Sequence, residues 1–83
     1  SHYYNEFRTD LILARRLLKS GGILCGDDCE LIPTPERLAL AKQLLDYDYV
    51  SIAGEMCHPG VMLALSEELD TFTIDCGLWW VRL

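Results

Sequence analysis

The chain has 83 residues, 51% of them hydrophobic and 24% charged, which is the composition of a folded protein and leaves room for one domain at most. Thirteen acidic against seven dispersed basic residues give a formal net charge of -6, which argues against nucleic-acid binding. No apolar run reaches the roughly 18–20 residues of a membrane span, and no signal-peptide pattern is present. We therefore expect a soluble, cytoplasmic protein without nucleic-acid or membrane partners.

The cysteines show no regular disulfide spacing, so reduced thiols are the better interpretation. Cys25 stands inside an apolar run, where we expect it to be buried. A zinc site could be drawn from Cys25, Cys29, Cys57, His58 and Cys76. These residues do not form the two closely spaced ligand pairs of a structural zinc site, however, and the expected burial of Cys25 also argues against this alternative.

The first element is an amphipathic helix. Apolar residues recur at spacings of three and four between Tyr4 and Lys19, and Ser20-Gly21-Gly22 supplies a C-terminal stop. The chain begins directly before this helix and without Met, which suggests that a segment precedes it.

Residues 22–26 form a short apolar run without alternation, which predicts a strand covered on both faces in a parallel sheet. The run ends in Asp27-Asp28. Because one parallel strand cannot form a sheet alone, we expect its neighbours to come from other sequence or from another chain.

Two further helices follow this strand. Thr34 and Pro35 have the pattern of an N-cap and a first helical residue, and this helix is predicted to end near Asp46. Residues 47–53 fit either a short strand or an irregular loop, and the sequence leaves both open. His58-Pro59-Gly60 then introduces a third helix.

The chain closes with two strand-like segments, residues 71–75 and 78–83, separated by a turn at Cys76-Gly77. A hairpin or consecutive edge strands would satisfy this pattern. Trp79 and Trp80 are adjacent and therefore face opposite sides of a strand, so we expect at least one of them in the core rather than in a stacking platform.

Asp27 and Asp28 are the strongest candidates for chemistry. In open α/β sheets, ligands bind beyond the carboxyl ends of the strands, which is where this doublet stands. Two adjacent carboxylates repel each other, and a hard cation such as Mg²⁺ would offset that repulsion. A solvated turn that caps the next segment is the alternative interpretation.

Four motifs follow one another along nearly the whole chain: Ser1-His2-Tyr3-Tyr4, Leu17-Leu18-Lys19-Ser20-Gly21-Gly22-Ile23-Leu24-Cys25-Gly26-Asp27-Asp28, His58-Pro59-Gly60-Val61 and Gly77-Leu78-Trp79-Trp80-Val81-Arg82. In this order they resemble the C-terminal half of class I S-adenosylmethionine-dependent methyltransferases. The similarity is greatest to small-molecule O-methyltransferases, in which a Leu-Leu-x-x-Gly-Gly turn leads into the fifth strand and an acidic pair ends it.

The resemblance implies a fold and a site. Residues 1–83 would be a partial methyltransferase domain: the second half of a Rossmann-like α/β sheet, with helix, parallel strand, helix, helix and terminal strands that include an antiparallel edge. In metal-dependent members the acidic pair binds Mg²⁺, so Asp27 and Asp28 would be metal ligands, and a third ligand would lie just before Ser1. His2 would accept a hydroxyl proton and, with Tyr3, contact S-adenosylmethionine.

The resemblance also implies methyl transfer to a small-molecule hydroxyl by the parent protein. None of the six glycines forms the Gly-x-Gly-x-x-Gly pattern of a cofactor loop, so we expect this chain alone to be inactive. Residues 30–57 look like an insertion that would form part of a substrate lid. The alternative function is a non-catalytic remnant that acts as an interaction module, with a homo-oligomer completing the sheet.

Overall fold

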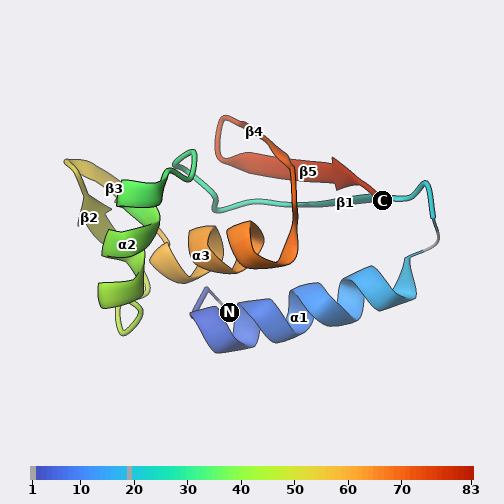
Figure 1. Cartoon of the computed structure of the whole chain (residues 1–83), viewed down its shortest axis with the longest axis horizontal. Helices are drawn as coiled ribbons and strands as arrows, with labels where there is room; N and C mark the ends of the chain where they lie inside the picture. The colour runs from blue at the N-terminus through green and yellow to red at the C-terminus, as the bar shows by residue number, and fades with distance from the viewer. Residues whose placement is uncertain (1, 19) are drawn as a thin grey trace.

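The computed structural model describes every residue except 1 and 19 and is a small mixed α/β fold, in which a sheet lies over two helices (Figure 1). Its elements are α1 (Tyr4–Leu17), β1 (Ile23–Gly26), α2 (Pro35–Gln43), β2 (Val50–Ile52), β3 (Glu55–Cys57), α3 (Pro59–Glu68), β4 (Thr73–Asp75) and β5 (Leu78–Arg82). The α/β class predicted from the sequence is confirmed. The predicted C-terminal end of the first helix, Lys19, lies outside the described residues, and so does Ser1.

The main sheet has three strands in the order β1-β5-β4, and both pairings are antiparallel. β1 and β4 therefore run in the same direction, with β5 reversed between them. The sequence predicts a parallel strand at β1, but its pairing in the described part of the chain is antiparallel, because the closing hairpin brings β5 alongside it. Among the described residues the other edge of β1 has no partner strand.

Two tight turns produce the two hairpins of the fold. Cys76 and Gly77, between β4 and β5, have φ angles of 51° and 80°, and Ala53 and Gly54, between β2 and β3, have 52° and 85°. Positive φ at both central residues matches the twist of antiparallel strands. The closing hairpin is one of the two arrangements that the sequence left open. Within residues 47–53, Val50–Ile52 is a strand, and its partner β3 was not predicted.

The predicted N-terminal ends of the last two helices are confirmed. The hydroxyl oxygen of Thr34 accepts a hydrogen bond from the backbone N–H of Arg37 at 3.2 Å, which caps α2. α3 begins at Pro59, directly after His58. α2 ends three residues earlier than expected, at Gln43, because Leu44 leaves helical geometry and a turn follows.

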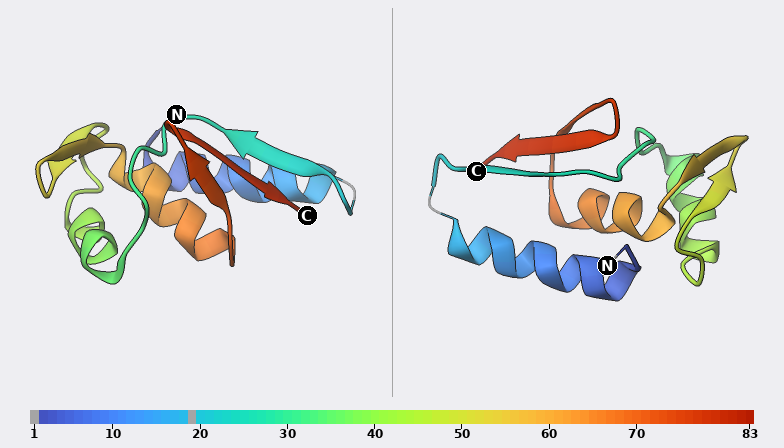
Figure 2. Two further views of the ribbon diagram at one scale, coloured as in Figure 1. Left: turned by 90° about the horizontal axis from the view of Figure 1, so that it is seen from above. Right: turned by 180° about the vertical axis from the view of Figure 1, so that it is seen from behind.

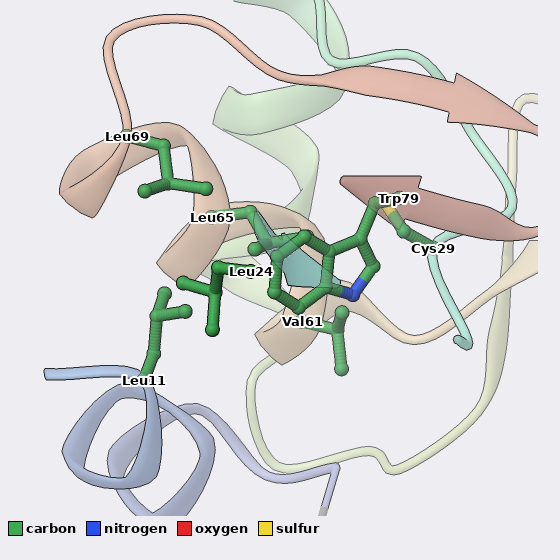
Figure 3. Packing of buried hydrophobic residues seen from close by; sticks show 7 residues of the cluster. All are labelled: Leu11, Leu24, Cys29, Val61, Leu65, Leu69 and Trp79. Carbon is green, nitrogen blue, oxygen red and sulfur yellow. The ribbon is translucent and has the colours of Figure 1, made fainter. Parts of the chain in front are cut away.

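Among the described elements, α1 and α3 cover one face of the main sheet (Figures 1 and 2). Trp79 is 3% exposed and lies at the centre of this layer (Figure 3). The buried cluster around it consists of Leu11, Leu24, Cys29, Val61, Leu65, Leu69 and Trp79. A second buried cluster joins α2 and the β2–β3 hairpin to α3 and consists of Leu31, Ala41, Ile52, Cys57 and Met62.

The opposite face of the sheet is uncovered by any described element. We call it the outer sheet face; it exposes the hydrophobic side chains Ile23, Cys25, Leu78 and Trp80, and the polar residues Thr73, Asp75 and Arg82 lie at the paired positions on the same face. The prediction that β1 is covered on both faces is therefore not met in the described chain, and the predicted burial of Cys25 is wrong. Alternation along β1 points Leu24 to the helices and Cys25 away from them. The expectation that at least one tryptophan is buried is confirmed by Trp79.

Hydrogen bonds and an ion pair join α1 to the C-terminal end of α3. The hydroxyl of Tyr4 donates to Glu67, and the Arg8 guanidinium contacts Glu68 at 3.0 Å. Arg15 donates to the carbonyl oxygen of Glu68 at 2.5 Å. In the part of the chain that the structure covers, every helix is too short or too polar to cross a bilayer.

We predict that Gly60→Ala destabilises the protein. A Cβ at this position would lie 2.5 Å from the backbone nitrogen of Tyr4 and 2.8 Å from the carbonyl oxygen of His2, and backbone atoms cannot yield as a flexible side chain can. Overpacking of this kind costs about 1–3 kcal/mol, which thermal or urea unfolding would measure. Ser66→Ala, on the same helix, is the control. A Gly60→Ala variant as stable as the unchanged protein would show that this close approach does not occur.

Candidate functional site

Three side chains from distant parts of the sequence converge at the carboxyl end of β1. His2 comes from the segment before α1, Asp28 follows β1, and His58 is the N-cap residue of α3. Asp28 has a φ of 65°, in the left-handed region that aspartate tolerates better than most residues. The chain thus turns sharply as it leaves the sheet. We call these three residues the His–Asp–His cluster.

The cluster is compact. His2 Nε2 lies 2.5 Å from Asp28 Oδ2, and the two imidazole ring centres are 4.2 Å apart. One donor atom from each of the three residues lies within 4.8 Å of the other two, so the cluster could hold a metal ion. All three residues are partly buried, with the His58 side chain only 11% exposed.

Two more carboxylates contact the histidines from behind. Glu30 Oε2 lies 2.9 Å from His58 Nδ1, and Glu30 Oε1 accepts the backbone N–H of His58 at 3.3 Å. Asp48 Oδ1 lies 3.5 Å from His2 Nδ1. The ring of Tyr49 packs on His58 with its centre 4.7 Å away. Glu30 thus positions His58, the N-cap residue of α3. The side chain of His58 itself makes no capping hydrogen bond.

The electrostatics of the cluster favour ionised Asp28. Partial burial on its own would raise the pKa of this carboxyl group, but the hydrogen bond from His2 and the charges of His2 and His58 act in the opposite direction. A side-chain hydrogen bond between Asp27 and Asp28 acts in the same direction. The net effect holds the pKa of Asp28 below its usual range.

The structure brings together two of the four residues predicted from the sequence, His2 and Asp28. Asp27 is exposed and borders the outer sheet face, and it is not part of the converging donor set. Tyr3 is half exposed and lines a shallow hollow with Asn5 and Leu45. The two carboxylates of the doublet thus face different surroundings.

Sequence reasoning did not assign His58, Glu30 and Asp48 to this site. The sequence indicates His58 as the residue that introduces a helix, as part of the His-Pro-Gly-Val motif and as a member of the alternative zinc set. One signal was available: the chain contains only two histidines, and both stand immediately before helical segments. Their convergence with Glu30 and Asp48 depends on how residues 30–57 fold back, which no local pattern encodes.

The cysteines take no part in this cluster. All four are free, and burial is the main cause that raises the pKa of Cys29 to about 12 and that of Cys57 to about 11. A metal ligand or nucleophile must be a thiolate, which these pKa values disfavour. Within the described chain, the donor group that converges contains no cysteine.

The fold and the cluster define a small mixed α/β protein with a histidine–carboxylate site at a strand end. Comparison with protein-family models, curated proteins and solved structures finds no match to this chain. Functional inference therefore depends on the geometry of the cluster and on the sequence motifs.

We predict that Asp28 titrates below the ordinary aspartate pKa of about 3.9. Because its pKa in the folded state is lowered, its ionised form stabilises the fold above the unfolded-state pKa. That contribution is lost as the pH falls through the folded-state pKa. Carboxyl ¹³C NMR would measure the titration, and His2→Gln should move the pKa upward. Exposed Asp70 is the internal control, and an unchanged Asp28 pKa in the variant would disprove the coupling.

Proposed function

We propose that the protein containing this chain transfers a methyl group from S-adenosylmethionine to a hydroxyl group of a small molecule. The observation that carries the proposal is the His–Asp–His cluster at the carboxyl end of β1, directly after the Gly-Gly-Ile-Leu-Cys-Gly-Asp-Asp motif. Methyl transfer to oxygen requires a hydroxyl that has lost, or is losing, its proton. The cluster combines the groups that can promote this loss.

The chain's own residues would bind and deprotonate the acceptor. The imidazole of His2 would accept the hydroxyl proton as a general base, and the Asp28 carboxylate 2.5 Å away would stabilise the resulting charge. Glu30 fixes the orientation of His58 through two contacts. Because His2 and Asp28 hold each other in place, little reorganisation would be needed when the acceptor arrives.

Two bound groups are implied by the proposal. The sulfonium of S-adenosylmethionine would supply the methyl group, and a divalent cation held by His2, Asp28 and His58 would lower the pKa of the acceptor hydroxyl. The cluster fits a cation, since its donor atoms converge within 4.8 Å. The glycine-rich loop that would bind the cofactor is absent from this chain, so the proposal assigns most cofactor recognition to sequence outside it.

The arrangement of the rest of the chain supports this proposal. β1 has an edge without a partner among the described residues, as expected of a strand that continues into a parallel sheet. Residues 30–57 follow the site after β1 and lead back to the site at His58. They contribute Glu30 and Asp48. This segment is the proposed lid over the acceptor.

We predict methyl transfer by the intact protein and its loss on substitution of the cluster. The assay incubates the protein with S-adenosylmethionine, a divalent cation and a panel of catechols and sugars, and follows S-adenosylhomocysteine. His2→Gln should lower kcat by roughly 10²–10⁴-fold, because it removes a group that either accepts the acceptor proton or helps to hold the cation that acidifies the acceptor.

Asp70→Asn is the control variant, because Asp70 is exposed and lies outside the cluster. The 83-residue chain alone should show no turnover. Failure of the folded, intact protein to bind S-adenosylmethionine by calorimetry, with cation present, would exclude the methyltransferase function.

The second candidate function is an interaction module that self-associates. The specific observation is the group of exposed hydrophobic side chains on the outer sheet face, which lies beside the edge of β1 that has no partner among the described residues. The occupant we consider is a second copy of the chain, because pairing between two β1 edges would continue the hydrogen-bonded ladder and align the exposed hydrophobic side chains of the two copies.

This candidate predicts that the melting temperature rises with protein concentration and that sedimentation finds dimers or larger species. Ile23→Lys, at the edge of the outer sheet face, should weaken association. Leu17→Lys is the matched control, since Leu17 is 84% exposed but lies on α1. An intact protein that sediments as a monomer at all concentrations would remove this function.

A further inference from the structure

We propose that the His–Asp–His cluster binds a divalent first-row transition metal ion, of the Zn²⁺, Fe²⁺ or Mn²⁺ class, rather than Mg²⁺. The ligands are His2, Asp28 and His58. This inference names the cation of the proposed function and to that extent rests on it, but ion binding can be measured without any methyl transfer.

The first argument is the chemistry of the donors. Two imidazole nitrogens and one carboxylate oxygen suit Zn²⁺, Fe²⁺ and Mn²⁺, whereas Mg²⁺ prefers oxygen ligands in near-ideal octahedral geometry. At metal–ligand bond lengths of about 2.0–2.2 Å, ligand atoms stand roughly 3–4 Å apart. The donor atoms here already lie within 4.8 Å of one another. Small side-chain rotations would therefore bring all three onto one ion.

The second argument is the support behind each histidine. Metal-binding histidines generally donate their other ring N–H to a carboxylate, which fixes the ring and raises the basicity of the ligating nitrogen. Glu30 stands at His58 Nδ1 at 2.9 Å, and Asp48 stands at His2 Nδ1 at 3.5 Å. Both rings are thereby left with Nε2 as the donor for an ion.

The third argument is a buried carboxylate oxygen that lacks a hydrogen-bond partner. Asp48 Oδ1 is buried and has no hydrogen-bond partner within the described structure, and leaving a carboxylate oxygen in this state is costly. In the tautomer in which His2 Nε2–H donates to Asp28, the neutral ring carries no proton on Nδ1. When an ion replaces the Nε2 proton, Nδ1 becomes the N–H donor that Asp48 Oδ1 lacks.

Charge also favours an ion at this position. The carboxylates of Asp28, Glu30 and Asp48 surround two imidazoles, and no lysine or arginine contacts them through a hydrogen bond or ion pair given by the described structure. A divalent ion would offset their mutual repulsion.

Ion binding refines the role of His2 and leaves room for the acceptor. With Nε2 on the ion, His2 is a ligand, and the ion itself lowers the pKa of the acceptor hydroxyl, whose proton passes to solvent. Three protein ligands leave coordination positions open. Two neighbouring oxygens of one acceptor, as in a catechol or a vicinal diol, would fit such positions.

The test measures ion binding to the intact, metal-free protein without S-adenosylmethionine or acceptor. Calorimetry with Zn²⁺ and absorption spectra with Co²⁺ should show one site, and Mg²⁺ at millimolar concentration should not compete. His58→Gln and Asp28→Asn should weaken Zn²⁺ binding more than about 100-fold, and Glu30→Gln about 10–100-fold. Asp70→Asn is the matched control and should bind Zn²⁺ as the unchanged protein does, because Asp70 is exposed and lies outside the cluster.

A second measurement needs no variant. In long-range ¹H–¹⁵N spectra of the unchanged protein, Zn²⁺ should shift the Nε2 resonances of both histidines and leave both Nδ1 atoms protonated. Loss of binding in Asp70→Asn but not in His58→Gln, competition by Mg²⁺, or unshifted histidine resonances would each overturn the proposal. Because no methyl donor is present, these results are independent of whether the protein transfers methyl groups.

Discussion

The close passage of residues 2–4 over Gly60 is the constraint on which the rest of the structure depends. Only a residue without a side chain lets the backbone of His2 and Tyr4 approach the first turn of α3 so closely. This contact sets where α1 begins and therefore how it packs beside α3. It also holds His2 next to the N-cap residue His58, so the same approach that joins the two helices assembles one side of the site.

The sheet is asymmetric, and its asymmetry has a physical cause. Leu24 and Trp79 point to the helices and are buried, whereas Cys25 and Trp80, one residue further along each strand, point to the outer sheet face. An alternating strand buried on one face would normally carry polar residues on the other. Here the second face is mixed: Ile23, Cys25, Leu78 and Trp80 are exposed beside the polar residues Thr73, Asp75 and Arg82.

The site is built from two layers of charge. Asp28 and the two histidines converge at the centre, and Glu30 and Asp48 stand behind the histidines. The outer carboxylates decide which ring nitrogen faces the centre, so they control the chemistry of the cluster without belonging to it. Four of these five residues come from the boundaries or interior of the segment between β1 and α3. Folding of that segment and assembly of the site are therefore one event.

Local patterns in the sequence were enough to predict the helices and the closing strands. Thr34-Pro35 and Pro59 begin helices because capping and the fixed φ of proline act within a few residues. The Cys76-Gly77 turn similarly marks the position of the last hairpin. His2 and Asp28 were identified as candidates because one precedes a helix and the other follows an apolar strand.

Tertiary structure alone decided the direction of pairing, the uncovered face and the membership of the site. Strand direction depends on which segments meet, and β1 meets β5, which lies more than fifty residues further along the chain. His58 reaches Asp28 because α3 packs on α1 and the sheet. Asp27 and Asp28 are indistinguishable in composition, yet the left-handed turn at Asp28 directs one carboxylate into the cluster and leaves the other exposed. Backbone direction at a single residue is set by long-range packing, and a sequence pattern does not contain it.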